Sequence, residues 1–457
     1  MIQARRGFFK WLPVAGLSAA GQTQPAPSLE RRLLARLKNI PVINTHEHIL
    51  PENERTAQTI DFFTLAGHYA INDVISAGLS QESLKIVNDP RAAIADRWRA
   101  FQPYWKAARF TGYAQALRIA INDIYGVAEI SGSTLQKINY AIQARNKPGL
   151  YRHVLKERAH IQFSVLDDYW NIAPLQPDPE FFVLAHRFDR FVQPWTREDI
   201  GRLEKATDVA ISSLSDLKQA LEKNFQQSLK AGMVTVKTAL AYERELLFHE
   251  VEEADAARDF DRMISGVEKL PDGFRRRTLR PFRKLEDYMF HQVLRLADAN
   301  GVAFQIHTGL TAANGNFVAN SNPTLLTNLF FLYPRLKFDL FHVSYPYQGE
   351  LSVLAKLFPN VYADFCWMHI VAPGAARRTL HDFLETVPAN KIFGFGGDYR
   401  YPELSYAHLQ MALRNIAQVL AEKTQSGFCT EDEAAELGRM LLHDNPAKLF
   451  SPHQKSA

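Results

Sequence analysis

Cysteine is scarce in this chain, because Cys366 and Cys429 are the only two among 457 residues. Two thiols are too few for a disulfide framework or a cysteine-rich metal site. An excess of one charge is also lacking, since 53 Lys and Arg residues against 49 Asp and Glu residues leave a formal net charge of +4. No basic patch therefore indicates a nucleic acid partner. No apolar run is long enough to span a bilayer, so we expect no stable membrane insertion.

What the chain does contain is a series of eight short apolar runs that alternate with segments of helical spacing. The runs cover residues 40–45, 161–166, 188–191, 232–238, 302–307, 336–342, 361–366 and 392–397. Strands that alternate with helices form parallel βα units, and eight such units favour closure into a barrel over an open sheet. The sequence therefore predicts one α/β domain over residues 28–457, a (β/α)8 TIM barrel. Residues 51–158 show helical spacing without a clear strand, which predicts a helical insertion after the first strand.

The first 27 residues resemble a twin-arginine export signal. Arg5 and Arg6 precede an apolar stretch over 11–21, and residues 18–20 are small enough for cleavage. The stretch is too short to cross a bilayer as a membrane anchor. The pattern predicts that residues 1–27 are a signal peptide and that the mature protein is exported to the periplasm. The alternative is a basic N-terminus on a cytoplasmic protein.

Polar side chains stand where the predicted strands end. His46 and His48 close the first strand, and their spacing of two places both imidazoles on one face. His307, His342 and Asp398 each close a different later strand. Any one of them alone is more often a hydrogen-bonded core residue or a helix cap. Five at the C-terminal ends of four barrel strands, where barrel active sites lie, favour one shared divalent ion.

These motifs resemble the amidohydrolase superfamily, in the amidohydrolase-related branch that includes decarboxylases, lactone hydrolases and, more distantly, uronate isomerases. The matching segments are Asn44-Thr45-His46-Glu47-His48, Ile306-His307-Thr308-Gly309, Phe341-His342 and Gly396-Gly397-Asp398, in the family's order. Residues 109–126 and the Asp167-Asp168 pair are also similar to the amidohydrolase half of nodulin/glutamine-synthetase fusion proteins. The resemblance implies a barrel of the metal-dependent hydrolase type.

The resemblance implies that His46, His48, His307 and Asp398 hold the metal ion. Mixed nitrogen and oxygen ligation with an open position suits zinc, with manganese or iron as alternatives. It also implies two catalytic residues. Asp398 would accept a proton from metal-bound water, and His342 would polarise the substrate or orient the water.

Lys237 ends the predicted fourth strand, and its role stays open. In some members of the superfamily a carboxylated lysine at this place bridges two metals, which would bring in a second ion. The amine could equally bind a substrate carboxylate or extend to solvent. We expect one ion, because the mononuclear branch gives the closer motif match. Glu47 points to the opposite face of its strand by alternation and is not expected to be a ligand.

Three residues in the loops after two of these strands are candidates for substrate binding: Tyr242, Arg244 and Arg400. An arginine fork binds carboxylates in a bidentate way, which favours a small acidic substrate. The alternative for each arginine is a salt bridge at the surface.

The favoured function is a metal-dependent hydrolase that cleaves an amide, ester or lactone bond of a small acid through metal-activated water. A non-hydrolytic decarboxylase or uronate-type isomerase on the same ligands is the alternative, since fold and ligands do not determine the reaction. A third hypothesis is an exported binding protein without catalysis. The partner we expect is a small-molecule substrate, and a homo-oligomer stays open.

Overall fold

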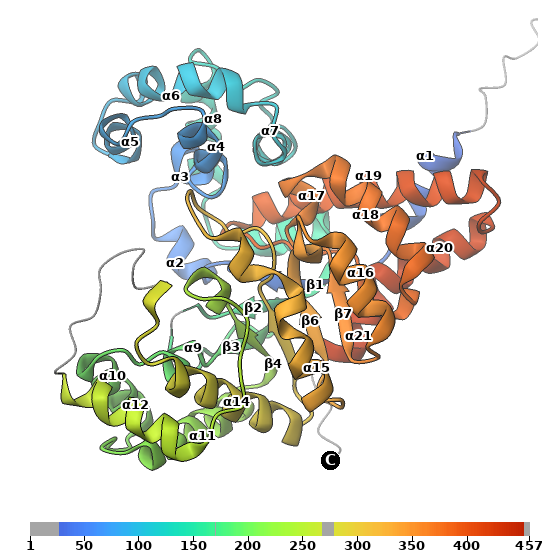
Figure 1. Cartoon of the computed structure of the whole chain (residues 1–457). Helices are drawn as coiled ribbons and strands as arrows, with labels where there is room; N and C mark the ends of the chain where they lie inside the picture. Colours follow the sequence, from blue (N-terminus) through green and yellow to red (C-terminus); the bar gives the residue numbers. More distant parts are fainter. Residues whose placement is uncertain (1–26, 170, 267–277, 452–457) are drawn as a thin grey trace, which may run out of the picture.

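The computed structural model describes residues 27–169, 171–266 and 278–451, and within these ranges eight parallel strands form one sheet in sequence order (Figure 1). The strands are β1 (Val42–Glu47), β2 (Ile161–Asp167), β3 (Phe182–Arg187), β4 (Met233–Thr238), β5 (Ala303–Ile306), β6 (Phe338–Leu340), β7 (Val361–Asp364) and β8 (Ile392–Phe393). Each strand pairs with the next in parallel. The predicted (β/α)8 barrel is confirmed.

Contacts between the two ends of the sheet bring β8 and β1 together. Thr45 donates its backbone N–H to the carbonyl of Phe395 at 3.2 Å, and Asp398 donates to the carbonyl of His46 at 2.9 Å. A closed sheet has no free edge. The segment after β8 therefore lies against the strand that carries the histidine pair.

The prediction of the third strand was wrong. The strand is β3 (Phe182–Arg187), whereas Phe188 precedes the short helix α9 (Asp189–Val192). Phe188 and Phe191 are three residues apart, which is helical spacing, and the charged pair between them does not suit a strand buried on both faces. The carboxylate of Asp189 instead accepts hydrogen bonds from the Thr238 hydroxyl at 2.7 Å and the Ala239 amide at 2.9 Å.

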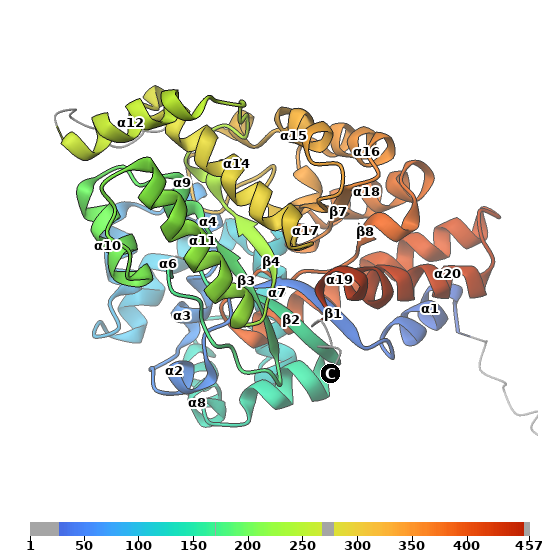
Figure 2. The ribbon, with the colours of Figure 1, turned by 90° about the horizontal axis from the view of Figure 1, so that it is seen from below.

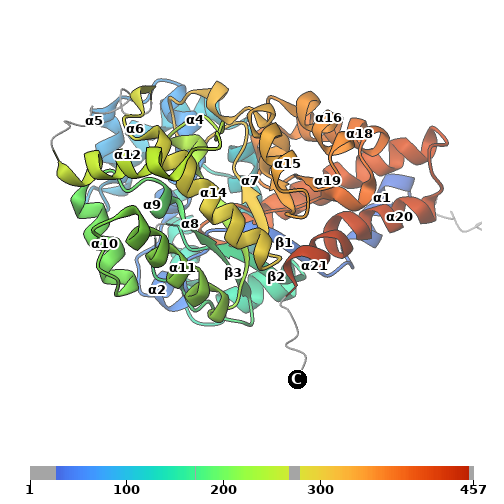
Figure 3. The ribbon, with the colours of Figure 1, turned by 60° about the horizontal axis from the view of Figure 1, so that its bottom comes forward.

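Helices cover the outside of the barrel. They are α1 (Leu29–Leu37), α10 (Arg197–Thr207), α11 (Leu214–Lys230), α12 (Glu253–Ser265), α14 (Arg283–Ala299), α15 (Thr327–Leu332), α16 (Gln348–Leu357), α17 (Met368–Val371), α18 (Pro373–Thr386), α19 (Pro402–Gln425), α20 (Glu431–Arg439) and α21 (Asn445–Phe450). Figure 2 shows α1 beside α19 and α20, and Figure 3 shows α10, α11, α12 and α14 together on one flank. Several begin at a capping box, for example Thr196 with Asp199 before α10, which satisfies the free amides of the first turn.

The segment between β1 and β2 is helical, as expected, and lies to one side of the barrel in Figure 1. It contains α2 (Glu52–Thr56), α3 (Phe62–Ala66), α4 (Ala70–Ser76), α5 (Gln81–Asn88), α6 (Ile94–Ala108), α7 (Gly112–Tyr125), α8 (Leu135–Arg145) and a π-helix (Arg152–Arg158). A buried ion pair of 2.7 Å joins Arg55 of this segment to Glu403 of α19. At the start of α7, a Cβ on Gly112 would lie 2.0 Å from the carbonyl oxygen of Ile370, so glycine allows the insertion to approach the barrel closely.

Among the described residues, no helix has both the length and the apolar character needed to cross a membrane. The predicted signal peptide falls almost wholly on residues 1–26, which lie outside the described residues.

Candidate metal centre and its cavity

The histidine pair of β1 faces a cavity of about 330 Å³. His46 and His48 are 1% and 8% exposed, and their Nε2 atoms lie 3.2 Å apart. The spacing of two on a strand places both rings on the inner face, as expected.

Asp398 joins this pair from the segment after β8. One carboxylate oxygen, Oδ1, lies 3.2 Å from Nε2 of His48 and 3.8 Å from Nε2 of His46. Asp398 has a positive φ of 58°, an unusual conformation for a residue other than glycine. Burial raises the pKa of this carboxyl, but the hydrogen bond from His48 and the nearby histidines outweigh burial and hold it well below its usual value.

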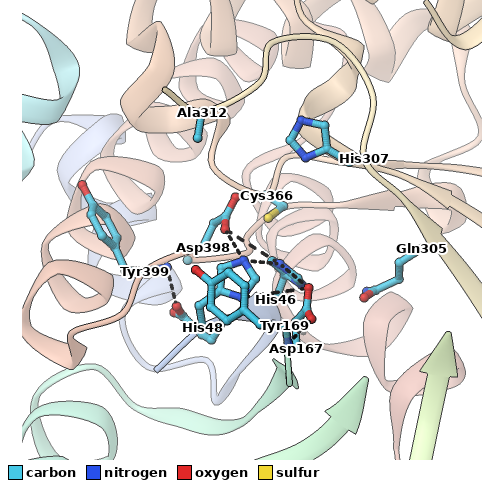
Figure 4. Close-up of polar contacts among 12 residues, drawn as sticks. His46, His48, Asp167, Tyr169, Gln305, His307, Ala312, Cys366, Asp398 and Tyr399 are labelled. Carbon is cyan, nitrogen blue, oxygen red and sulfur yellow. Dashed lines mark hydrogen bonds and ion pairs between the residues drawn. The ribbon is translucent and has the colours of Figure 1, made fainter. Parts of the chain in front are cut away.

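Asp167, at the end of β2, belongs to the same group, although the sequence argument did not assign it to the site. Its Oδ2 lies 3.7 Å from Nε2 of His46 (Figure 4). The ligand atoms of His46, His48 and Asp167 all lie within 4.8 Å of one another. The sequence signal that could have identified Asp167 was its position, because Asp167 ends the second apolar run as Asp398 ends the eighth.

A second group lies next to the first and shares its aspartate. The ligand atoms of His342, Cys366 and Asp398 also lie within 4.8 Å of one another, and Figure 4 shows the Cys366 sulfur beside the Asp398 carboxylate. His307 is in neither group, and it stands apart from His46 and His48 in Figure 4. It lines the same cavity and contacts His342 instead.

The contact between His307 and His342 tests whether these residues suit a cation. His342 donates from Nδ1 to the carbonyl of Cys366 at 2.8 Å, and His307 donates from Nε2 to the carbonyl of Leu310 at 2.9 Å. The remaining nitrogens therefore present lone pairs to each other, 3.0 Å apart. Burial lowers the pKa of His307 well below its usual value and that of His342 to about 4. A shared proton is thus disfavoured, and the donor set suits a divalent metal ion.

Glu47 lies on the other face of β1, as expected, and connects the segments that carry His46 and Asp398. Its carboxylate accepts hydrogen bonds from the Asn44 amide at 2.6 Å, the Tyr399 backbone at 2.8 Å and the Ser405 hydroxyl. A Cβ on Gly397 would lie 1.8 Å from its Oε1. The glycine before Asp398 therefore lets the segment after β8 lie against Glu47.

A cationic side of the cavity is formed by β3 and β4. Arg187 and Lys237 are register partners on these strands, and both line the cavity. Arg187 binds Asp167 in a bidentate way, at 2.9 and 2.5 Å. Burial lowers the pKa of Lys237 to about 8, and its Nζ lies 3.5 Å from the centre of the Phe341 ring. Arg187 was not predicted as a site residue, because the third strand was expected at residues 188–191 and not at Phe182–Arg187.

Of the three residues expected at the rim, only Tyr242 lines this cavity. Its hydroxyl accepts a hydrogen bond from the Ala312 amide at 3.0 Å. Arg244 is 1% exposed and pairs with Glu286 at 2.9 Å and Asp287 at 2.6 Å. The prediction that Arg244 lies at the rim was therefore wrong, because two buried carboxylates hold its guanidinium away from the cavity.

Arg400 is exposed and also does not line the cavity. It lines a neighbouring hollow, and His68 lies between the two, since it lines both. The prediction that Arg400 lies at the rim of the cavity was therefore wrong.

Aromatic residues and the helical insertion complete the walls. Tyr169, after β2, stacks on His48 with ring centroids 3.9 Å apart. Tyr69 and His68 come from the insertion, and the Tyr69 hydroxyl donates to the backbone carbonyl of Asp398 at 2.7 Å. Tyr69 and Tyr169 have positive φ angles of 76° and 56°. Sequence patterns gave no signal for them, because only the tertiary fold brings the insertion to the strand ends.

Comparison with known protein families matches the amidohydrolase model to residues 234–451. Over this part, which is just under half of its length, the chain resembles amidohydrolases. The chain is 27% identical over 257 residues to protein fluG of Emericella nidulans, a match that covers 54% of this chain and 29% of fluG. It is 24% identical to uronate isomerase of Brucella canis, over 91% of this chain and 94% of that protein. The structure of uronate isomerase from Thermotoga maritima superimposes with a TM-score of 0.77 at 17% identity, covering 92% of this chain and 97% of that chain.

These findings confirm the predicted resemblance to the amidohydrolase superfamily and support an enzyme with this fold. The hydrolase function expected from the sequence is contradicted, because curated relatives that align with 91% and 92% of the chain are uronate isomerases. The physical reason for the error is that one ligand set serves both reactions. A bound divalent ion can activate water or polarise a carbonyl, and the motifs do not distinguish the two.

Proposed function

We propose that this protein is a metal-dependent isomerase that interconverts the aldehyde and ketone forms of a hexuronate. The observation that carries the proposal is the match to uronate isomerases over 91% of this chain and 94% of the relative. Hydrolysis and decarboxylation both break a bond in the carbon or acyl skeleton, whereas this reaction only moves hydrogen between neighbouring atoms.

The ion is proposed to be held by His46, His48 and Asp398, whose ligand atoms face one another at 3.2 to 3.8 Å. Asp167 lies next to this set, whereas His307, predicted as the fourth ligand, stands apart from it in the same cavity. Zinc suits these nitrogen and oxygen donors, with manganese or iron as alternatives. When bound, the ion supplies a Lewis acid that polarises a substrate oxygen.

The cationic side of the cavity is proposed to bind the carboxylate of the substrate. Arg187 and Lys237 project from adjacent strands, and both are at least 93% buried, so their charges act at low dielectric. Asp167 offsets part of the charge of Arg187, which leaves Lys237 as the cation that the substrate neutralises. A molecule held there extends toward Asp398, across a cavity of about 330 Å³ that suits a small molecule.

The proton is proposed to move between neighbouring carbons through the Asp398 carboxylate. One oxygen faces His48, while Oδ2 lies 4.0 Å from Nε2 of His342 and makes no shorter contact with it. A carboxylate whose pKa is held low stays ionised at neutral pH, which is the form that can accept a proton, and it gives the proton up again readily. His342 is neutral for the reason given above, and its Nε2 faces His307 of the cavity wall at 3.0 Å, so its predicted catalytic role is proposed to act through His307.

The experiment is an NMR assay of the full chain, loaded in turn with Zn²⁺, Mn²⁺ and Fe²⁺ and mixed with glucuronate or galacturonate in deuterated water. We expect a ketose product of unchanged skeleton, with deuterium at the carbon that receives the proton. Lactone and amide derivatives of the same acids serve as hydrolysis controls. Hydrolysis of these derivatives without any ketose from the free acids would overturn the proposal.

A further inference from the structure

Exposed apolar side chains gather on two helices away from the cavity. Phe331 and Leu332 of α15 are 71% and 41% exposed, and Val353 and Leu357 of α16 are 54% and 66% exposed. The Phe331 ring lies 4.9 Å from the ring of Phe358, which directly follows α16. The two helices lie side by side in Figures 2 and 3. We refer to these four exposed side chains as the α15–α16 patch.

The patch is not part of the core. The inner face of α16 buries Leu351, Leu354 and Ala355 against the barrel. The outer face carries exposed residues three and four apart: Glu350, Val353, Lys356 and Leu357. Residues at this spacing form one stripe along a helix. The stripe thus presents Val353 and Leu357 beside two charged residues, on a face that the fold of a single chain leaves uncovered.

The area of the patch matches the centre of a dimer interface. With about 150 to 200 Å² for a fully exposed side chain of this size, the four expose on the order of 400 Å² together. Two copies would contribute about 800 Å². Since interfaces are about 57% apolar, the complete interface would bury about 1,400 Å². This lies within the range of about 1,200 to 2,000 Å² for stable protein pairs.

The charges beside the patch are complementary to a second copy of themselves. Glu350 and Lys356 lie three residues before and three residues after Val353. In the described part of the chain neither forms an ion pair. If two copies of α16 cross antiparallel at Val353, Glu350 of each copy lies beside Lys356 of the other. The same arrangement places Leu357 over Gly349, where a Cβ would meet nothing within 4 Å.

We propose that the α15–α16 patch is the interface of a homodimer, with a two-fold axis near Val353. A two-fold axis uses the same surface on both subunits, so one helix can supply both charges of each ion pair. This inference does not depend on the proposed function.

The test is the mass of the full chain in solution, measured by sedimentation equilibrium over a range of concentrations. Val353→Glu places a charge at the centre of the interface, and we expect it to halve the mass of the species. Glu350→Lys turns two attractive contacts into two repulsive ones and should raise the dissociation constant about tenfold or more. The double variant Glu350→Lys with Lys356→Glu exchanges the charges and should restore the wild-type constant. Tyr140→Glu, at a side chain 74% exposed on α8, is the matched control and should change nothing.

A wild-type chain that stays monomeric at about 100 μM, a hundred times a micromolar dissociation constant, would overturn the proposal. So would a Val353→Glu variant with the wild-type mass. If Glu350→Lys dissociates and the double variant does not recover the wild-type dissociation constant, the antiparallel crossing is overturned. Hexuronate turnover by the dissociated variants is a separate readout, because none of these residues lines the cavity.

Discussion

Replacing Lys237 with methionine should stabilise the metal-free chain while weakening substrate binding. The amine is 2% exposed, and in the described part of the chain its one specific contact is the ring of Phe341. Burial is the largest cause that lowers its pKa from 10.5 to about 8. The charged form of the Lys237 amine is therefore less favourable in the folded protein than in the unfolded chain.

The magnitude follows from this pKa. A change from 10.5 to about 8 disfavours the charged amine by about 3 kcal/mol in the folded state, at about 1.4 kcal/mol per tenfold change in proton affinity. The contact with Phe341 offsets about 1 kcal/mol. Methionine of similar length should thus raise the free energy of unfolding by about 2 kcal/mol.

The pH dependence has a definite sign. Because the folded pKa lies below the unfolded one, the penalty is fully present below pH 8 and is relieved between pH 8 and 10.5. The advantage of Lys237→Met should therefore shrink as the pH rises through this window.

Urea unfolding of chelator-treated protein at several pH values measures the effect. Lys391→Met is the matched control, since burial also lowers the pKa of Lys391 to about 8. The Lys391 amine, however, donates to the carbonyls of Ala355 and Phe358. Loss of Lys391 removes a buried charge but also leaves buried acceptors without a donor, at a cost of about 1 to 3 kcal/mol. Lys391→Met should therefore stabilise the chain less than Lys237→Met does. Equal changes in the free energy of unfolding for the two variants, or a Lys237→Met difference that is independent of pH, would refute the reasoning.

Three further predictions concern the site. In Glu47→Gln an amide group replaces the carboxylate that accepts three hydrogen bonds, so one of the three donors would face another donor. Metal affinity, measured by chelator competition, should therefore fall about 10- to 100-fold. An unchanged affinity would contradict the connecting role of Glu47. Arg187→Met leaves the buried Asp167 without its partner and should cost about 3 to 5 kcal/mol in urea unfolding, with Arg187→Lys intermediate; a loss below about 1 kcal/mol would count against a buried ion pair. Asp398→Asn should lower kcat at least about 100-fold, with Asp398→Glu partly active; a change in KM alone would remove Asp398 as the base.

The barrel could be predicted from the sequence because its strands are short, buried and separated by helices. Residues 161–166 and 232–238 carry runs of apolar and β-branched residues, and β2 and β4 form there. The third strand was misplaced because Phe188 and Phe191 were interpreted as a strand from their apolar character. Their spacing of three residues, with two charged residues between them, is typical of a helix. That error also hid Arg187, which ends the true strand.

Part of the site was predictable for a related reason. In a parallel barrel the strand ends converge, so polar residues that close apolar runs meet in space. His46, His48 and Asp398 meet in this way. Arg244 does not join this group, because Glu286 and Asp287 of α14 bind its guanidinium. Both carboxylates lie more than 40 residues away from Arg244 in the chain. No local pattern encodes such a pairing.

The most direct test of the central claim, a single-metal isomerase site, is a metal titration of the chelated full chain. Bound Zn²⁺ and the rate of ketose formation from hexuronate are followed together, in the wild type and in the His46→Ala, His48→Ala double variant. The account predicts that both quantities reach a plateau at about one equivalent in the wild type and that neither rises in the variant. Full activity after chelation, a plateau at two equivalents, or wild-type behaviour of the double variant would contradict it.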